Sequence, residues 1–278
     1  MYSGNISSSS LSHGHGGVDL VTFTANENKK TQNPHLALRR FYAAPENIEG
    51  GVAILDPEET RHLVRVLRLG VGANVAVSDG QGCHWEAVVE SVNPRGAVLK
   101  LGAEMEPWGE SPLDLTLCIG LAKGETLDGV MRQATEMGVK EILPFVSQRS
   151  EPAAPERQAR RLVRWQRIAR ESLKSCQRSN LPVIHPPQEF RAILIGPEEV
   201  KLLFYEDEKG GLEAALRRAR PGGVRVVIGP EGGFAPQEVA LAKKANFQIV
   251  SLGPRRLKVE TAALAALTLI QFAWGDVK

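Results

Sequence analysis

The chain has 278 residues and a formal net charge of +2, with basic and acidic side chains present in nearly equal number. This balance excludes a protein that is basic over its whole surface, so any nucleic-acid binding must come from local clusters of charge. Three scattered cysteines without C-x-x-C spacing argue against a zinc site or a disulfide framework and indicate a cytoplasmic setting, and no apolar run is long enough to cross a membrane.

The first 38 residues are rich in Ser, Gly, Asn and His and contain one short apolar island. Such a composition cannot bury enough apolar surface to fold, so we predict a disordered N-terminal extension over residues 1–38. His13 and His15 are the only metal-binding side chains that stand out there. Two histidines in a flexible tail make a weak site, and we predict no metal.

Residues 39–108 carry short strand-like runs separated by turn residues such as Asp79-Gly80. One helix interrupts these runs, with Asp56 as its N-cap and Pro57 in its first turn. The strands are predicted at residues 51–55, 74–78, 84–92 and 97–101, and the helix at residues 57–69. Several short strands with a single helix predict a small β-barrel domain.

Basic residues gather at two places in this predicted barrel. Two arginines precede the aromatic pair Phe41-Tyr42, and His62 shares a helix face with Arg65. Aromatic side chains beside arginines favour contact with RNA, whereas the alternative interpretation is a solvated helix face. The candidate RNA-binding residues of this domain are Arg39, Arg40, His62, Arg65 and Arg68.

A polar, proline-containing segment at residues 104–112 is typical of a linker. Over residues 113–278, strand-like runs then alternate with helical segments. Strands are predicted at 113–120, 139–145, 183–184, 201–205, 224–228 and 247–252, and helices at 126–137, 157–176, 211–218, 236–244 and 260–272. This alternation predicts an α/β domain with a parallel sheet covered by helices on both faces, in which ligands gather at the carboxyl ends of the strands.

The last predicted helix, residues 260–272, is apolar on almost every side. A helix at the surface of a monomer would show one polar face, and this one does not. We therefore expect it to be buried, either in the core of the domain or against a second subunit.

The long predicted helix at residues 157–176 carries two stripes of different character. One is mostly apolar and is expected to pack. The other, the basic stripe, consists of Arg160, Arg164, Arg167, Lys174 and Arg178. Residues 149–178 hold nine basic residues against three acidic ones, which favours a phosphate-binding surface over the alternative of a solvated face. The candidate RNA-binding residues of this region are Arg149, Arg164 and Arg178.

Two glycine-containing turns follow consecutive predicted strands. Gly229-Pro230-Glu231-Gly232-Gly233 comes after residues 224–228, and Leu252-Gly253-Pro254 comes after the next strand. Glycines let the backbone approach a ligand closely, and a helix N-terminus offers free N–H groups. The two turns therefore predict one shared pocket. Because the sequence has no G-x-x-x-x-G-K-[ST] or G-x-G-x-x-G motif, a nucleoside-like ligand is favoured over a triphosphate or a dinucleotide.

Short motifs along most of the chain point to one known family. They are Arg39-Arg40-Phe41, His62-Leu63 with Val66-Leu67-Arg68, Lys123-Gly124, Thr135-Glu136-Met137-Gly138-Val139, Arg149-Ser150, Arg164-Trp165, Arg178 with Pro182, residues 228–233, and Leu252-Gly253 through Glu260-Thr261-Ala262. From Arg39 onward the sequence resembles the RsmE family of rRNA uridine-N3 methyltransferases in the SPOUT superfamily. The resemblance implies a PUA-like RNA-binding barrel at residues 39–108, and a SPOUT α/β domain with a deep C-terminal trefoil knot at residues 113–278.

The same resemblance implies an activity and a set of site residues. The family is a homodimer that uses S-adenosyl-L-methionine to methylate N3 of a specific uridine in 16S rRNA of the small ribosomal subunit. The implied cofactor-binding residues are Ile228, Gly229, Pro230, Glu231, Gly232, Gly233, Leu252, Gly253, Leu257 and Thr261. Glu231 is the candidate acid or base, or a contact of the cofactor amine. Arg178 is the candidate that would hold a phosphate or stabilise the uracil anion.

The chain departs from the family motifs at several side chains. Arg256 stands where the family commonly has isoleucine, Lys258 where it has arginine, and Ser175 where it has glutamine. Two alternatives therefore stay open: a SPOUT methyltransferase that acts on another RNA nucleotide, and a non-catalytic RNA-binding homologue.

Overall fold

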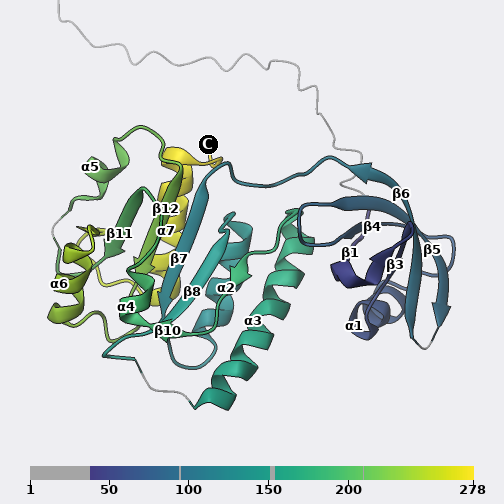
Figure 1. Cartoon of the computed structure of the whole chain (residues 1–278), viewed down its shortest axis with the longest axis horizontal. Helices are drawn as coiled ribbons and strands as arrows, with labels where there is room; N and C mark the ends of the chain where they lie inside the picture. The colour runs from purple at the N-terminus through teal and green to yellow at the C-terminus, as the bar shows by residue number, and fades with distance from the viewer. Residues whose placement is uncertain (1–37, 94, 151–153, 209) are drawn as a thin grey trace, which may run out of the picture. The chain divides into compact units, whose positions relative to one another are not determined.

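A computed structural model describes residues 38–93, 95–150, 154–208 and 210–278 of the protein. The extension predicted over residues 1–38 lies outside these ranges except for its last residue, so its disorder stays a prediction. The described residues form two β-sheets of different construction (Figure 1).

The first sheet has six strands in the order β1-β4-β5-β6-β3-β2. Their bounds are β1 (Arg40–Tyr42), β2 (Ile48–Glu49), β3 (Val52–Ile54), β4 (Asn74–Ser78), β5 (His84–Asn93) and β6 (Gly96–Met105), with a 3-10 turn η2 (Pro45–Asn47) between β1 and β2. β1 pairs with β4 in parallel, and the other neighbours are antiparallel. The inward-facing apolar side chains enclose one core, which includes Phe41, Leu55 and Leu99.

The helix of this first domain is shorter than predicted. α1 (Pro57–Arg61) begins after Asp56, whose carboxylate accepts a hydrogen bond from the N–H of Glu59 at 2.8 Å, so the predicted N-cap is confirmed. A π-helical turn, η3 (His62–Val66), follows. The chain then leaves the helix because Arg68 takes a left-handed φ of +55°.

The pairing of the first sheet also differs from that of a closed barrel. Among the described strands, hydrogen-bonded pairing runs from β1 to β2 and does not join these two edges. β6 extends to Met105, so the first residues of the predicted linker belong to a strand. The first domain is therefore built on a six-stranded sheet with β1 and β2 as its edge strands.

The second sheet has seven strands, all parallel. They are β7 (Asp114–Gly120), β8 (Glu141–Val146), β9 (Val183–Ile184), β10 (Gln188–Glu189), β11 (Val200–Phe204), β12 (Gly223–Ile228) and β13 (Gln248–Val250). Their order is β10-β8-β7-β12-β11-β13, with β9 also paired to β8. The predicted parallel α/β sheet is thus confirmed, and β10 is the one strand of this sheet that the sequence did not indicate.

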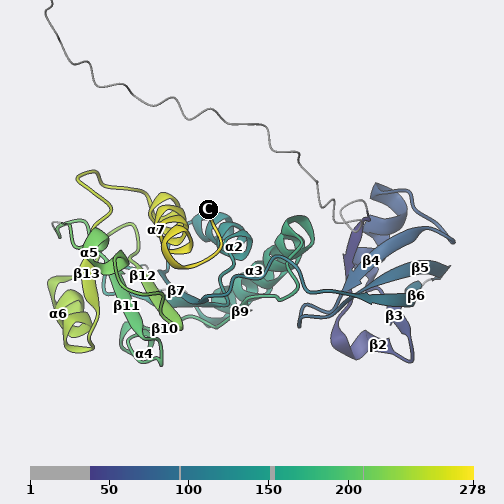
Figure 2. The same cartoon turned by 90° about the horizontal axis from the view of Figure 1, so that it is seen from above.

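Helices cover both faces of this sheet, as Figure 2 shows. Their bounds are α2 (Thr126–Glu136), α3 (Pro155–Cys176), α4 (Phe190–Ile193), α5 (Leu212–Leu216), α6 (Pro236–Lys244) and α7 (Val259–Trp274). α2, α3, α5 and α7 pack on one face and α4 and α6 on the other. Successive strand residues serve the two cores in turn, for example Leu117 and Ile119 on one side and Cys118 on the other.

The last helix is buried on one side only. Ala266, Leu267 and Ile270 of α7 lie in the larger core, as predicted. Leu264, Leu269 and Phe272 are exposed, Phe272 by 67 %. An apolar face therefore remains uncovered on α7 in the isolated chain. The trefoil knot that the resemblance implies stays a prediction.

Candidate active site

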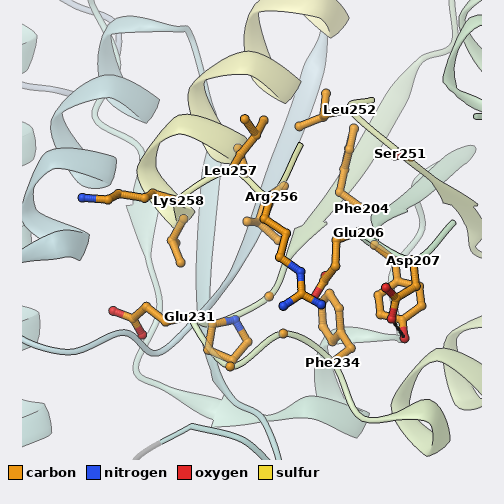
Figure 3. Close-up of a pocket in the computed structure, with 18 of the residues that line it drawn as sticks. Phe204, Glu206, Asp207, Glu231, Phe234, Ser251, Leu252, Arg256, Leu257 and Lys258 are labelled. Atoms are coloured by element: carbon orange, nitrogen blue, oxygen red, sulfur yellow. Dashed lines mark hydrogen bonds between the residues drawn. The ribbon is translucent and has the colours of Figure 1, made fainter. Parts of the chain in front are cut away.

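A cavity of about 560 Å³ lies at the carboxyl ends of β11, β12 and β13 (Figure 3). Its size is within the range of roughly 300–1,000 Å³ that is usual for small-molecule sites. Three segments form its walls: residues 204–207 after β11, residues 228–234 at the end of β12, and residues 251–260 leading into α7. The two glycine-containing turns therefore line one shared cavity, as the sequence predicted.

Close backbone packing shapes the turn after β12. A side chain at Gly120, the last residue of β7, would place its Cβ 2.4 Å from the backbone nitrogen of Pro230. Gly233 has a φ of +67°, and its N–H donates to the Pro230 carbonyl at 2.9 Å. Phe234 is buried behind the turn and stacks on Phe145, with ring centroids 6.3 Å apart. The turn is therefore rigidly placed and keeps its backbone at the cavity wall.

A buried carboxylate positions a second loop beside this turn. Glu238 of α6 accepts hydrogen bonds from the N–H groups of Ala235 and Gln148, at 2.8 and 2.9 Å, and from the hydroxyl of Ser147 at 3.0 Å. These bonds join the loop after β8 to the start of α6. They place Arg149, the next residue of that loop, at the edge of the cavity.

Two charged residues of the cavity are held by backbone groups. The Glu231 carboxylate accepts a hydrogen bond from the N–H of Lys123 at 3.0 Å. The Arg149 guanidinium donates to the carbonyl of Gly232 at 3.0 Å. Glu231 remains exposed to solvent at the cavity, so its carboxylate can also meet a ligand.

The wall formed after β11 was missed in the sequence analysis. Phe204, Tyr205, Glu206 and Asp207 all line the cavity. The Tyr205 hydroxyl donates to Asp207 at 2.9 Å, and this bond, together with partial burial, raises the pKa of Tyr205. The only signal in the sequence is that these residues follow a strand of a parallel sheet, where ligands gather.

Nine of the ten predicted cofactor-binding residues line this cavity. They are Ile228, Gly229, Pro230, Glu231, Gly232, Gly233, Leu252, Gly253 and Leu257. The tenth, Thr261, is exposed on α7 and is not part of the lining. Arg255, Arg256 and Lys258 also contribute to the wall, although only their neighbours were predicted.

The basic stripe of α3 is largely engaged within the chain. Arg164 forms ion pairs with Glu125, at 2.8 Å, and with Asp128. Arg167 pairs with Glu58 of α1 at 3.4 Å. These contacts tie α3 to α2 and to the first domain, which favours the solvated or structural interpretation of the stripe over an open phosphate-binding surface.

Lys174 is the one lysine of the stripe, and its ammonium group is buried against its carboxylate partners. Its ammonium group contacts Glu59 of α1 and Glu171, and the Lys174 and Glu59 side chains are each only 6 % exposed. Burial lowers the pKa of Lys174, but the two carboxylates outweigh burial, so the pKa lies above its ordinary value. Lys174 therefore stays charged in the folded protein and joins the two domains.

Arg178 does not reach the cavity. Its side chain is 2 % exposed and forms an ion pair with Glu110 at 3.0 Å. Its other donors bond the carbonyls of Thr135 and Val139, at 2.8 and 3.0 Å. Because its guanidinium is used inside the chain, the contacts of Arg178 indicate a structural role in place of the catalytic and RNA-binding roles expected from the sequence.

The candidate RNA-binding residues of the first domain divide into two groups. Arg40 is half-buried and donates to Gln177 at 3.5 Å, and the ring of His62 lies 6.1 Å from that of Phe41. The exposed candidates are Arg39, Arg65 and Arg68. These three, with Arg149, are the predicted cations that remain open to a polyanion.

The described residues contain neither a cluster of metal ligands nor a membrane-spanning helix. No group of three or more His, Cys, Asp and Glu in the described ranges could hold a metal ion. No helix in the same part of the chain is long and apolar enough to cross a membrane.

The parallel sheet and its cavity belong to a known class, the RNA methyltransferases. Residues 109–271 match the family described as RNA methyltransferase domain, and residues 55–102 match the RNA methyltransferase PUA domain. The fold neighbours of this class include SPOUT methyltransferases with a PUA-like N-terminal domain.

More specific relatives identify the family within this class. The chain is 32 % identical over 247 residues to ribosomal RNA small subunit methyltransferase E of Synechocystis. The matched region covers 87 % of this chain and 80 % of that protein. The crystal structure of the Neisseria gonorrhoeae enzyme of that name, bound to S-adenosylmethionine, is 33 % identical with a TM-score of 0.78, covering 87 % of this chain and all of that one. A Legionella pneumophila protein solved with S-adenosylmethionine is 30 % identical with a TM-score of 0.79, over 86 % and 99 % of the two chains. The chain belongs to the ribosomal RNA small subunit methyltransferase E family.

Proposed function

We propose that the protein methylates N3 of a specific uridine in 16S rRNA of the small ribosomal subunit, with S-adenosylmethionine as methyl donor. The observation that carries the proposal is the single cavity lined by both glycine-containing turns, in a chain of this family. An enzyme with this substrate works in the cytoplasm, where ribosomes are assembled.

The cavity residues fit S-adenosylmethionine. Residues 228–233 line the cavity, and a Cβ at Gly229 would lie 2.9 Å from the Phe234 ring, so glycine is needed where the turn packs on that ring. Leu252 and Leu257 supply apolar surface for a purine. When bound, the cofactor would supply an electrophilic methyl group. The protein would hold it through backbone groups of the two turns.

Methylation at N3 requires that the uracil lose its N3 proton, because the neutral ring has no free lone pair there. Glu231 is our candidate for the proton acceptor. Its carboxylate is fixed by the Lys123 N–H and remains exposed at the cavity. A base inside a folded rRNA must leave its stack to reach this position, so the target nucleotide would be flipped. Holding both reactants in one geometry can supply on the order of 7 kcal/mol.

The first domain, residues 39–108, is proposed to bind rRNA and residues 113–278 to carry the methyltransferase site. Arg39, Arg65 and Arg68 are exposed on the first domain, and Arg149 lies at the cavity edge. Exposed arginines can contact phosphates without the cost of breaking an internal ion pair. These four residues are therefore the proposed RNA contacts, whereas Arg164 and Arg178 are not.

We also propose that the protein is a homodimer through α7. Leu264, Leu269 and Phe272 form an apolar face that is exposed in the isolated chain, and Thr261 lies on the same helix. Apolar surface of this kind favours association. Phe272→Ser should convert a dimer to a monomer in sedimentation at micromolar concentration, with Phe272→Leu as the matched control. A wild-type protein that sediments as a monomer would contradict the proposal.

The activity is tested by methyl transfer from labelled S-adenosylmethionine to small ribosomal subunits that lack the modification. We expect 3-methyluridine at one position after digestion of the RNA, and Glu231→Gln should lower the rate by about two orders of magnitude or more. Transfer to a different nucleotide or to tRNA would replace the proposed substrate. Cofactor binding without any transfer would favour a non-catalytic RNA-binding protein.

A further inference from the structure

Opposite charges stand on two walls of the cavity and have no partner within the described ranges. Arg256 belongs to the segment between β13 and α7, and Glu206 to the segment after β11. Figure 3 shows the Arg256 side chain extending across the cavity toward Glu206 and Phe234. Among the described residues, neither Arg256 nor Glu206 makes a hydrogen bond or an ion pair, and both are exposed at the cavity.

Three of the other charged side chains that line the cavity have partners within the chain, whereas Arg255, Lys258 and Glu260 line it as well. Asp207 accepts the Tyr205 hydroxyl, Glu231 accepts the Lys123 N–H, and Arg149 donates to a backbone carbonyl. The Lys258 side chain points away from the cavity in Figure 3. Because Arg256 extends toward Glu206, these two are the oppositely charged pair that converges on one point of the cavity.

The position of Glu206 is set by the glycine turn. An ideal Cβ at Gly233 would lie 2.6 Å from the Glu206 carboxylate oxygen Oε1, so the carboxylate rests over the space that a side chain at position 233 would occupy. The left-handed φ of Gly233 disfavours a side chain at that position in any case. The turn thus keeps this end of the cavity open for a charged group.

We propose that Arg256 and Glu206 together bind the amino-acid tail of S-adenosylmethionine, Arg256 through the carboxylate and Glu206 through the ammonium group. This inference rests on the proposed function, because it assigns residues to its cofactor. A zwitterion is the ligand chemistry that an arginine and a glutamate on facing walls recognise, and hydrogen bonds between charged groups are the stronger ones. The two residues would then make the site selective for the complete cofactor over adenosine derivatives that lack the tail.

The test is equilibrium binding to the full chain, by calorimetry, of three probes. S-adenosylmethionine carries both tail charges, decarboxylated S-adenosylmethionine lacks the carboxylate, and 5′-methylthioadenosine lacks the whole tail. Arg256→Gln should weaken the binding of S-adenosylmethionine by about tenfold to a hundredfold and leave the affinities for the other two probes unchanged. Glu206→Gln should weaken both sulfonium probes by a similar factor and leave 5′-methylthioadenosine unchanged.

For Arg256→Gln, a purely nonspecific electrostatic effect predicts a change in S-adenosylmethionine affinity of the opposite sign, so the experiment distinguishes the two explanations. Removing the positive charge of Arg256 should strengthen a cationic sulfonium ligand if only the general field matters. Lys244→Gln, which removes an exposed charge on α6, is the matched control and should leave all three affinities unchanged.

Several results would overturn the assignment. One is an equal loss of affinity for all three ligands in Arg256→Gln. Another is tighter binding of S-adenosylmethionine by that variant, and the last is an unchanged affinity together with slower methyl transfer. The last result would mean that Arg256 acts on RNA. If the wild-type chain binds 5′-methylthioadenosine but not S-adenosylmethionine, the proposed function itself fails, and this outcome is distinct from a failure of the tail assignment.

Discussion

The cavity and the basic stripe of α3 both stand out in the sequence, yet their residues are used differently. The cavity is formed by backbone turns whose glycines have positive φ or pack closely against neighbouring residues, so its shape follows from the local sequence. The stripe is formed by long side chains, and most of them find carboxylates from distant segments, such as Glu58 and Glu59 of α1. A cluster of glycines thus defines a site more reliably than a cluster of charges does, because the partners of charged side chains are not visible in the local sequence.

The largest effect that would sharpen this comparison is expected at Lys174. Lys174→Met removes one member of a buried pair and leaves Glu59 without its cation, which should cost about 3–5 kcal/mol of unfolding free energy in urea titrations. Arg167→Gln is the matched control, since its pair with Glu58 is half exposed and should contribute at most about 1 kcal/mol. If Lys174→Met were as stable as the wild type, the stripe would not be structural.

The same pair gives a pH dependence with a defined sign. The pKa of Lys174 is raised in the folded state, so the folded protein holds this proton more tightly than the unfolded chain does. Its contribution to stability is complete below the ordinary value of 10.5 and is lost as pH rises through the higher folded pKa. The difference in unfolding free energy between wild type and Lys174→Met should therefore be constant from neutral pH to mildly alkaline pH and shrink above it. A difference that grows with pH would contradict the assignment.

A smaller loss of stability, with a complete loss of binding, is expected where β7 meets the glycine turn. The Cβ of Gly120→Ala would lie 2.4 Å from the Pro230 nitrogen, so the turn must move, at a cost of about 1–3 kcal/mol. Binding of S-adenosylmethionine in calorimetry should fall below detection. Gly129→Ala in α2, where a Cβ would meet nothing within 4 Å, should keep binding and gain slightly in stability. Normal binding by Gly120→Ala would mean that the backbone does not determine the cavity.

The smallest effects are expected in RNA affinity. Substitution of exposed arginines should change the salt dependence of binding, and substitution of ion-paired arginines should not. The double variant Arg65→Gln and Arg68→Gln should lower the slope of log Kd against log salt by about 0.7–0.9 for each phosphate contact that is lost. Arg164→Gln should leave the slope unchanged, because that side chain is paired with Glu125 and Asp128. Filter binding of small-subunit rRNA at several salt concentrations measures both. The reverse ranking would restore the stripe as the RNA surface.

Much of the fold was predictable because apolar runs and turn residues are local signals. The alternation of strands and helices after residue 113 is confirmed, and α6 (Pro236–Lys244) has the bounds expected from the sequence. β10 (Gln188–Glu189) was missed because its two residues are polar and lack the β-favouring character of the equally short β9 (Val183–Ile184), and the four residues of α4 (Phe190–Ile193) are too few to show a helical periodicity.

The part of the cavity formed by the two glycine-containing turns was predictable from the sequence. The wall formed by the segment at the end of β11 was not. Phe204–Asp207 form a wall only because β11 lies beside β12 in the sheet, and a strand order cannot be derived from one segment. The location of Arg178 outside the cavity was not predictable for a related reason. Its partner Glu110 is 68 residues away, and nothing near position 178 indicates a buried ion pair.

The carboxylate of Glu238 has a consequence for genetics. Glu238 is not among the residues that line the cavity, yet its hydrogen bonds join Ser147 and Gln148 to the first turn of α6, and Arg149 follows directly in the chain. In a mutational screen for loss of methylation, substitutions at position 238 should therefore share the phenotype of substitutions at position 149, although the two residues are 89 positions apart (238 − 149). An inhibitor that depends on Arg149 would accordingly meet resistance alleles on α6, outside the surface that it contacts.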